Sequence, residues 1–138
     1  MTFAKKTMAA AVLAVIAALG FTGVATAKSL ADSKSVNAGL VAIGVADEIR
    51  RNCPDINARM VKAYTYLNSL ERQAKAEGFS QSEIDAYVDD KAQKARLIEV
   101  AKKYMASKGV DGSAESYCKL GHQEIAGGTK VGALLREK

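Results

Sequence analysis

Residue types that carry familiar chemistry are scarce in this chain, which has two cysteines and one histidine among its 138 residues. Two cysteines are too few for an iron–sulfur cluster, and no Cys-x-x-Cys-His sequence is present to attach haem. The Gly-x-Ser-x-Gly turn of hydrolases and the glycine-rich loop of dinucleotide-binding proteins are also missing. We therefore expect no cofactor and no enzymatic activity. The alternative is an unrecognised activity built on His122, the only histidine, together with carboxylates.

Positive charge is too dilute to indicate a nucleic-acid partner. Two of the 20 basic residues lie in the first 27 positions, which leaves 18 basic and 15 acidic side chains in the rest of the chain. The longest basic clusters are two pairs, Arg50-Arg51 and Lys102-Lys103. Nucleic-acid binding requires a denser basic patch, so we expect no nucleic acid among the partners.

A long apolar run occurs only near the N-terminus. Lys5 and Lys6 precede the apolar run 8–19, and small residues follow it up to Ala27. This order is typical of a cleaved secretory signal, so we expect a signal peptide over 1–27 and a periplasmic protein. The alternative is an uncleaved N-terminal membrane anchor, because about 20 apolar residues span a bilayer. After cleavage we expect no transmembrane segment.

The two cysteines, Cys53 and Cys118, predict one disulfide in an exported chain. Closing this loop would stabilise the fold by about 4 kcal/mol on the chain-entropy model. The alternative is a pair of buried free thiols. On a helix, Cys118 and His122 would share one face and could bind zinc together with Cys53. An oxidised Cys118 cannot act as a ligand, so we expect no metal site.

The helical period dominates the rest of the sequence and predicts an all-α fold. Apolar residues recur at spacings of three and four, and no segment alternates as a half-buried strand does. We expect a flexible segment 28–34 and then a single helical domain over 35–138, with four to five antiparallel helices stapled by the disulfide. The expected helices cover 35–52, 55–77, 80–107 (as one helix or as two divided at Asp89-Asp90), 113–126 and a last turn or two from Thr129.

The strongest local signal marks the start of the third of these helices. Ser80 is followed three residues later by Glu83, which is the spacing of a capping box. Phe79 and Ile84 occupy the two positions of a hydrophobic staple around that cap. We therefore expect a helix to begin at Ser80.

Small residues mark one side of the helix expected at 35–52. Gly39 and Gly44 lie there among several alanines, and each glycine costs about 1 kcal/mol relative to alanine in a helix. Such a cost predicts that another helix packs closely against this side. The alternative is a helix of low stability.

Two apolar stripes are expected to face the core. The first lies on 55–77 and the second on 80–107, and their members are Ile56, Met60, Ala63, Tyr64, Leu67, Leu70 and Ala74, then Ile84, Val88, Ala92, Ala95, Ile98, Ala101 and Met105. Tyr64 and Tyr66 lie two positions apart on one helix, so they cannot both be buried. We assign Tyr66 to a candidate binding surface with Arg50, Arg51 and His122. The alternative for this tyrosine is a half-buried site in a groove between helices.

Several blocks of the sequence together resemble a family of small exported bacterial proteins of unknown function. They are ADEIRRNCPDINARM (46–60), GFSQSEIDAYVDD (78–90), KGVD (108–111), YCKLGHQEIAGGT (117–129) and VGALL (131–135). The resemblance implies no activity, cofactor or catalytic residue. Genes of this family are associated with those of the respiratory NADH dehydrogenase, and some members carry that enzyme's name.

These observations lead to one expected function and two alternatives. We expect a non-enzymatic periplasmic helical module that binds or stabilises an unidentified protein partner, with a membrane complex among the candidates. The resemblance implies the first alternative, an accessory or assembly factor of the respiratory NADH dehydrogenase. The second alternative is a small periplasmic stress chaperone or inhibitor.

Overall fold

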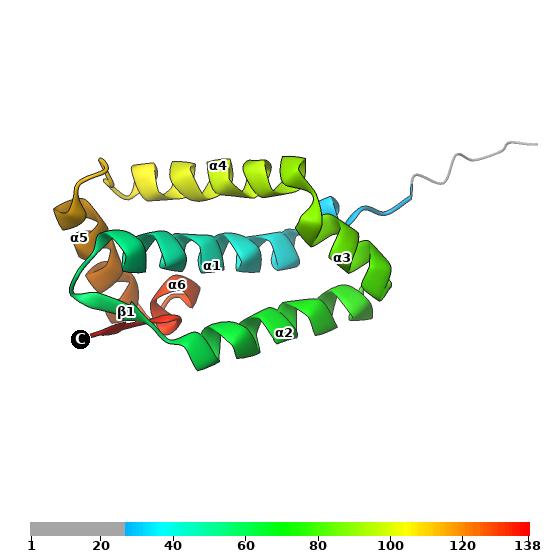
Figure 1. Cartoon of the computed structure of the whole chain (residues 1–138), viewed down its shortest axis with the longest axis horizontal. Helices are drawn as coiled ribbons and strands as arrows, with labels where there is room; N and C mark the ends of the chain where they lie inside the picture. The colour runs from blue at the N-terminus through cyan, green and yellow to red at the C-terminus, as the bar shows by residue number, and fades with distance from the viewer. Residues whose placement is uncertain (1–26) are drawn as a thin grey trace, which may run out of the picture.

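The computed structural model describes residues 27–138 and confirms the all-α prediction (Figure 1). The expected signal peptide, or anchor, lies outside the described residues apart from Ala27. Between residues 27 and 138, no helix is both long enough and apolar enough to cross a bilayer. The elements are η1, a 3-10 turn (Leu30–Asp32), α1 (Lys34–Asn52), β1 (Ile56–Ala58), α2 (Met60–Ala76), α3 (Gln81–Asp89), α4 (Lys91–Ser107), α5 (Ala114–Ala126), α6 (Lys130–Ala133) and β2 (Leu135–Glu137).

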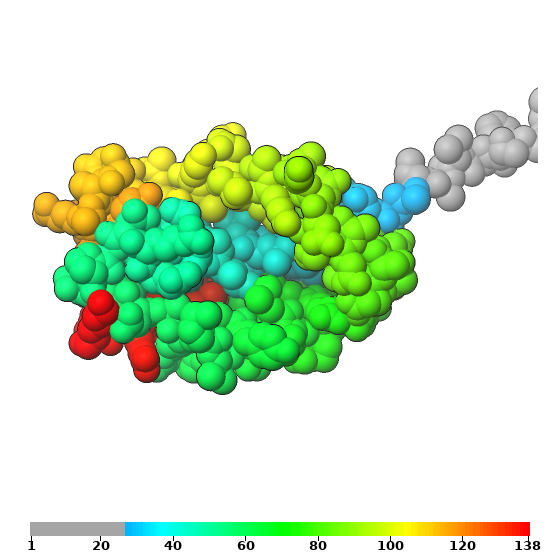
Figure 2. All heavy atoms as spheres, viewed as in Figure 1, coloured from blue at the N-terminus to red at the C-terminus, as the bar shows by residue number. Residues whose placement is uncertain are grey.

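Helix α1 is central, with α2 along one side and α4 along the other (Figure 1). The space-filling view shows α1 in a recess between these two helices (Figure 2). Helix α2 runs antiparallel to α1, as a short connection favours. Helix α4 instead runs parallel to α1, because α3 carries the chain across the end of the molecule where α1 begins. The three long helices therefore alternate in direction along the chain, as the antiparallel prediction requires, and α1 and α4, the first and third of them, run parallel.

Residues 28–34, which the sequence predicts to be flexible, instead pack onto the helices. The side chain of Leu30 is only 5% exposed, and it shares a buried cluster with Val36 of α1. The N-cap of α1 is Ser33, whose Oγ accepts a hydrogen bond from the Val36 amide. Helix α1 therefore begins before the expected cap at Ser35, because burial of Leu30 holds the preceding turn against the helix.

A short two-stranded sheet is the main element that the sequence prediction misses. Strand β1 lies in the segment predicted as the start of a helix over 55–77, and it pairs antiparallel with β2 so that Ile56 lies opposite Glu137. Helix α2 consequently begins only at Met60. Strands of three residues are too short to show an alternating pattern, and this pair joins segments that are far apart in the sequence.

Two helices, α3 and α4, occupy the range 80–107, so the divided alternative is correct. The carboxylate of Asp90 caps α4 by accepting a 2.9 Å hydrogen bond from the Gln93 amide. The predicted capping box is confirmed at the start of α3. There the Ser80 Oγ accepts a hydrogen bond from the Glu83 amide, and the Glu83 carboxylate accepts one from the Ser80 amide.

Helix α6 packs unusually close to α5. Thr129 caps α6 as predicted, because its Oγ1 accepts a 3.0 Å hydrogen bond from the Gly132 amide. A Cβ placed on Gly132 would lie 1.9 Å from the carbonyl oxygen of Glu124. This approach of one backbone to another is therefore possible only with glycine at position 132.

The buried apolar side chains form two cores. The disulfide-end core lies where α1 ends, and its most buried members are Val45, Ile49, Cys53, Ile56, Leu120 and Leu135. The cap-end core lies where α1 begins and consists of Leu30, Val36, Ala74, Phe79, Ile84 and Tyr87. Phe79 and Ile84 are thus buried in one cluster, as the predicted staple requires. Helix α1 contributes side chains to both cores.

Candidate functional surfaces

The cysteine pair belongs to the disulfide-end core. The Sγ atoms of Cys53 and Cys118 are 2.01 Å apart and their Cα atoms are 5.0 Å apart, which is disulfide geometry. The predicted pairing is therefore confirmed. It ties the end of α1 to α5, which is the fifth α-helix rather than the fourth because the range 80–107 is divided.

Within residues 27–138, one group of three side chains has the residue types and spacing that could bind a metal ion. Ligand atoms of Cys53, Asp55 and Cys118 lie within 4.8 Å of one another. Two of these atoms are the disulfide sulfurs, which offer no thiolate to a metal. His122 does not join the group, since its Nδ1 lies 2.9 Å from Glu137 Oε1 on β2. The disulfide therefore accounts for this cluster.

The residues assigned to a binding surface lie on three different helices. Arg50 and Arg51 lie at the end of α1, and both bind the Asp47 carboxylate, at 2.6 and 2.9 Å. His122 lies on α5, beside the C-terminal strand. Tyr66 lies on α2 and is half-buried. Their assignment to one binding surface stays a prediction.

Helix α2 buries only part of the predicted stripe, because Met60, Tyr64 and Leu67 are exposed. The side chains directed toward the rest of the protein are Ala63, Tyr66, Leu70 and Ala74. Leu70 lies against Gly39, and a Cβ placed on Gly39 would lie 2.4 Å from the Leu70 Cδ2. The predicted close approach is therefore confirmed at Gly39. At Gly44 an added Cβ would have no neighbour within 4 Å. The prediction of a buried Tyr64 and an exposed Tyr66 is therefore wrong, and Tyr66 takes the half-buried alternative.

The outer side of α2 carries an unpaired row of apolar side chains. The exposed fractions are 66% for Met60, 82% for Val61, 68% for Tyr64 and 41% for Leu67. Positions 60, 64 and 67 follow the i, i+4, i+7 spacing of one helix face. We call these four residues the α2 apolar face. A hollow of about 380 Å³ lies beside Val61, between α2 and α6.

The second predicted stripe is also only partly buried. Ile84, Ala101 and Met105 are buried, whereas Val88 and Ile98 are exposed. The break between α3 and α4 rotates the two halves of the stripe relative to each other. A single periodic face over 80–107 therefore does not exist.

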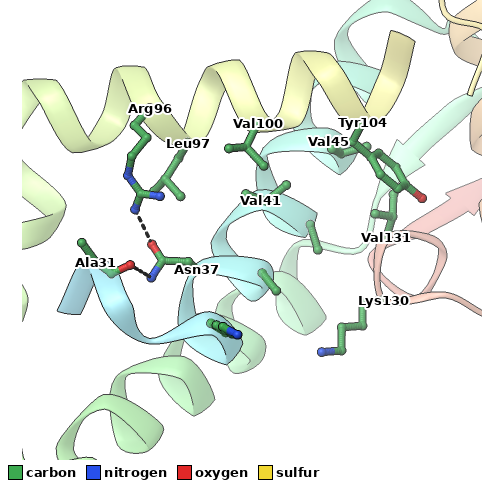
Figure 3. A pocket seen from close by; sticks show the side chains of 13 residues that line it. Ala31, Asn37, Val41, Val45, Arg96, Leu97, Val100, Tyr104, Lys130 and Val131 are labelled. Atoms are coloured by element: carbon green, nitrogen blue, oxygen red, sulfur yellow. Dashed lines mark hydrogen bonds between the residues drawn. The ribbon is translucent and has the colours of Figure 1, made fainter. Parts of the chain in front are cut away.

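A groove of about 520 Å³ lies between α1 and α4 and reaches α6 (Figure 3). Three cationic side chains enter it from three different helices, namely Lys34, Arg96 and Lys130. Its other lining residues are mostly apolar: Ala31, Asn37, Ala38, Val41, Ala42, Val45, Leu97, Val100, Tyr104 and Val131. We call this feature the cationic groove.

A neutral hydrogen-bond network fixes Arg96 at one end of the cationic groove (Figure 3). Its Nη2 donates to the Asn37 Oδ1 at 2.9 Å and to the Tyr87 hydroxyl at 2.7 Å, and that hydroxyl also donates to Asn37. The Asn37 amide nitrogen donates to the carbonyls of Leu30 and Ser33. One buried asparagine therefore joins η1, α1, α3 and α4.

At the other end of the groove, Tyr104 contacts a buried carboxylate. Its hydroxyl donates a hydrogen bond to Glu124 of α5, which is only 4% exposed, and the Thr129 hydroxyl donates to the second oxygen of that carboxylate. Burial, together with the neighbouring Glu124, raises the pKa of Tyr104 to about 12. The phenol therefore remains protonated, as a hydrogen-bond donor, at neutral pH.

Sequence reasoning missed both of these surfaces, for different reasons. The α2 apolar face has a clear helical spacing, but a spacing alone does not say whether the stripe faces the core or the solvent. The cations of the groove, Lys34, Arg96 and Lys130, come from distant parts of the chain. Their meeting depends on the parallel packing of α1 and α4, for which the sequence has no local signal.

A family model described as a family of unknown function matches residues 28–136, nearly all of the described chain. No curated protein matches the sequence. No solved structure matches it either.

Proposed function

This chain belongs to DUF5333, a family of unknown function, and we propose that it is a non-enzymatic helical module that binds a protein partner through the α2 apolar face. The observation that carries the proposal is the exposure of Met60, Val61 and Tyr64, each of which is about two-thirds exposed or more. Single exposed apolar residues are common on protein surfaces, but a contiguous row of large ones marks an interaction site.

The energetics favour an apolar partner surface. Burying one such side chain releases about 1.5–3 kcal/mol relative to leaving it in water. Tyr64 adds a large, rigid side chain of the type that is enriched in binding hot spots. The hollow beside Val61 offers room for a side chain of the partner, and its lining includes Leu134 and Ala133. A helix with its own apolar stripe, laid along α2, fits this arrangement.

We place this function in the periplasm. The support is the Cys53–Cys118 disulfide, because such bonds persist in oxidising compartments and are rare in the cytosol. Residues 1–27 supply the second argument, which is their signal-like order of basic, apolar and small residues. The partner would then be a periplasmic protein or the periplasmic part of a membrane complex.

Site-specific photo-crosslinking in intact cells tests the proposal. A photoreactive amino acid is placed at Tyr64 and, as a matched control, at Lys103, an exposed position on α4. We expect a discrete crosslinked protein from position 64 and none from position 103. Val61→Glu should abolish the crosslink without unfolding the protein, because this side chain is 82% exposed. Equal crosslinking from both positions, or none from position 64, would refute the proposal.

The identity of the crosslinked protein separates the remaining alternatives. A subunit of the respiratory NADH dehydrogenase would support the accessory role that the resemblance implies. A wide mixture of unrelated proteins that increases under acid stress would support the chaperone. A single periplasmic protein outside that complex would support the dedicated module that we propose.

A further inference from the structure

We propose that the cationic groove binds a fatty acid, with the hydrocarbon chain between α1 and α4 and the carboxylate held by Lys34 and Arg96. This site goes beyond the proposed protein-binding function. It shares no residue with the α2 apolar face, although Lys130 also lines the hollow beside Val61, and it lies against α4, on the other side of α1 from α2.

The size and walls of the groove fit a single hydrocarbon chain. Its volume of about 520 Å³ lies within the range of ligand pockets, roughly 300–1,000 Å³. Its α1 wall extends from Lys34 to Val45, which is about 16 Å of helix at ~1.5 Å per residue. Between the cationic ends, the walls consist of alanine, valine and leucine side chains, against which each buried methylene gains free energy.

The polar groups of the groove exclude an extended peptide as the occupant. Backbone N–H and C=O groups of α1 and α4 are bonded within their helices, so they cannot pair with a peptide backbone. Of the uncharged polar side chains in the lining, Asn37 already binds Arg96 and Tyr104 already binds Glu124. A ligand with one polar end and a long hydrocarbon chain has no polar groups of its own to leave unpaired between these walls.

The three cations of the groove form no salt bridge within residues 27–138, which favours an anion as the ligand. No carboxylate in residues 27–138 lies within 4.0 Å of Lys34, Arg96 or Lys130, and residues 1–26 contain no aspartate or glutamate. Arg96 is held by neutral partners through Nε and Nη2, which leaves its Nη1 donors without a partner in the described chain. A carboxylate is the natural acceptor for such a fixed guanidinium.

Lys130 lines the groove from α6 (Figure 3). Its aliphatic stem can cover the hydrocarbon chain while the charge stays in water. Lys34 and Lys130 are both exposed, so either can be changed without disturbing a core. These two lysines are therefore better test positions than Arg96, which also ties α4 to α1.

Calorimetric titration with laurate, paired with NMR of the valine and leucine methyl groups, tests the site in the purified protein. We expect laurate to bind and to shift the methyl signals of Val41 and Val100. Dodecyltrimethylammonium, a cation with the same chain, should bind at least about tenfold more weakly. Failure of laurate to bind up to about 1 mM, or shifts at Val61 and Leu67 instead, would overturn the proposal.

Two pairs of variants separate the charge from the apolar wall. Lys34→Gln/Lys130→Gln should weaken laurate binding about tenfold, whereas Lys94→Gln/Lys103→Gln should leave it unchanged. Ala38→Trp, which fills the groove from α1, should remove binding, and Ala106→Trp, which lies outside it, should not. Binding that survives Ala38→Trp would disprove the site.

Dodecyl phosphate identifies the head group. We expect it to bind no more tightly than laurate, and a tenfold preference for the phosphate would overturn the assignment of a fatty acid. Crosslinking from position 64 does not involve the groove. Failure of this inference and failure of the proposed function are therefore separate results.

Discussion

The two ends of α1 are held by different means. Where α1 ends, its neighbours are joined by ties between distant segments: the Cys53–Cys118 disulfide, the β1–β2 pair and the close approach of α6 to α5. Where α1 begins, the ties are caps and hydrogen bonds, centred on Asn37 and on the capping box at Ser80. The difference teaches that one end depends on covalent and steric ties over long range, and the other on many smaller local ones.

The largest expected effect comes from removing the covalent tie. Cys53→Ala/Cys118→Ala should lower the free energy of unfolding by about 4 kcal/mol, because the unfolded chain regains the entropy of a long loop. Urea unfolding of the oxidised wild type and of the variant measures this difference. The wild type in reductant serves as the control and should approach the variant. A loss below about 1 kcal/mol would mean that the disulfide end is not the more strongly held one.

The close approach of α6 to α5 gives the next largest effect. Gly132→Ala should cost about 2–3 kcal/mol, because the new Cβ would meet the carbonyl of Glu124, a backbone group that cannot rotate away. Gly44→Ala is the matched control in α1, where no atom lies within 4 Å of the added Cβ. That variant should gain up to about 1 kcal/mol from helix propensity. Thermal unfolding of both variants measures these changes. A Gly132→Ala protein as stable as the wild type would show that the contact between α6 and α5 is not tight.

At the other end of α1, the central asparagine should matter most. Asn37→Ala should cost about 2 kcal/mol, because Tyr87, Arg96 and the carbonyl of Ser33 lose a partner at once. Tyr87→Phe should cost only about 1 kcal/mol, since Arg96 still donates to Asn37. Chemical denaturation of the two variants measures the ratio. Equal losses would show that the network does not centre on the asparagine.

A smaller effect is expected at the cap of α3. Ser80→Ala should cost about 1 kcal/mol, because the Glu83 amide loses its acceptor. Ser80→Thr keeps a capping hydroxyl and should remain within a few tenths of the wild type. Denaturation curves of the three proteins test this order. A Ser80→Thr protein as unstable as Ser80→Ala would show that the hydroxyl is not the stabilising group.

The last expected effect is absent at neutral pH and is a dependence of stability on alkaline pH. The pKa of Tyr104 rises from its ordinary 10.0 to about 12 in the folded protein, so folding favours the protonated phenol. Its contribution is complete below pH 10 and is lost as the pH rises through about 12. Tyrosinate absorbance should therefore show late titration of Tyr104, and Tyr104→Phe should remove this late step. A late tyrosine that persists in Tyr104→Phe would assign the shift to another residue.

The cap end was the more predictable of the two, because its signals lie within a few residues. The spacing of Ser80 and Glu83 predicts the capping box, and the Asp89-Asp90 pair offered the helix break as one of two alternatives. At the disulfide end, the pairing of Cys53 and Cys118 could be predicted by counting cysteines. The β1–β2 pair could not, because three-residue strands carry no pattern and their register depends on the finished fold.

The functional surfaces were harder to predict than the fold. The spacing of Met60, Tyr64 and Leu67 identifies one face of a helix, but the buried face of α2 is set by contacts such as Leu70 against Gly39. The cationic groove requires α4 to lie beside α1 rather than beside α2, which precedes it in the chain. Both surfaces therefore depend on tertiary packing that local sequence patterns do not encode.

The position of α1 between two cores has a consequence for cooperativity. Since the same helix supplies Val36 to one core and Ile49 to the other, neither core can open fully without exposing part of it. Amide hydrogens in the middle of α1 should then exchange only through global unfolding, while those of α3 and of the outer side of α2 exchange through smaller openings. A single helix would thereby make two unlike halves melt as one unit.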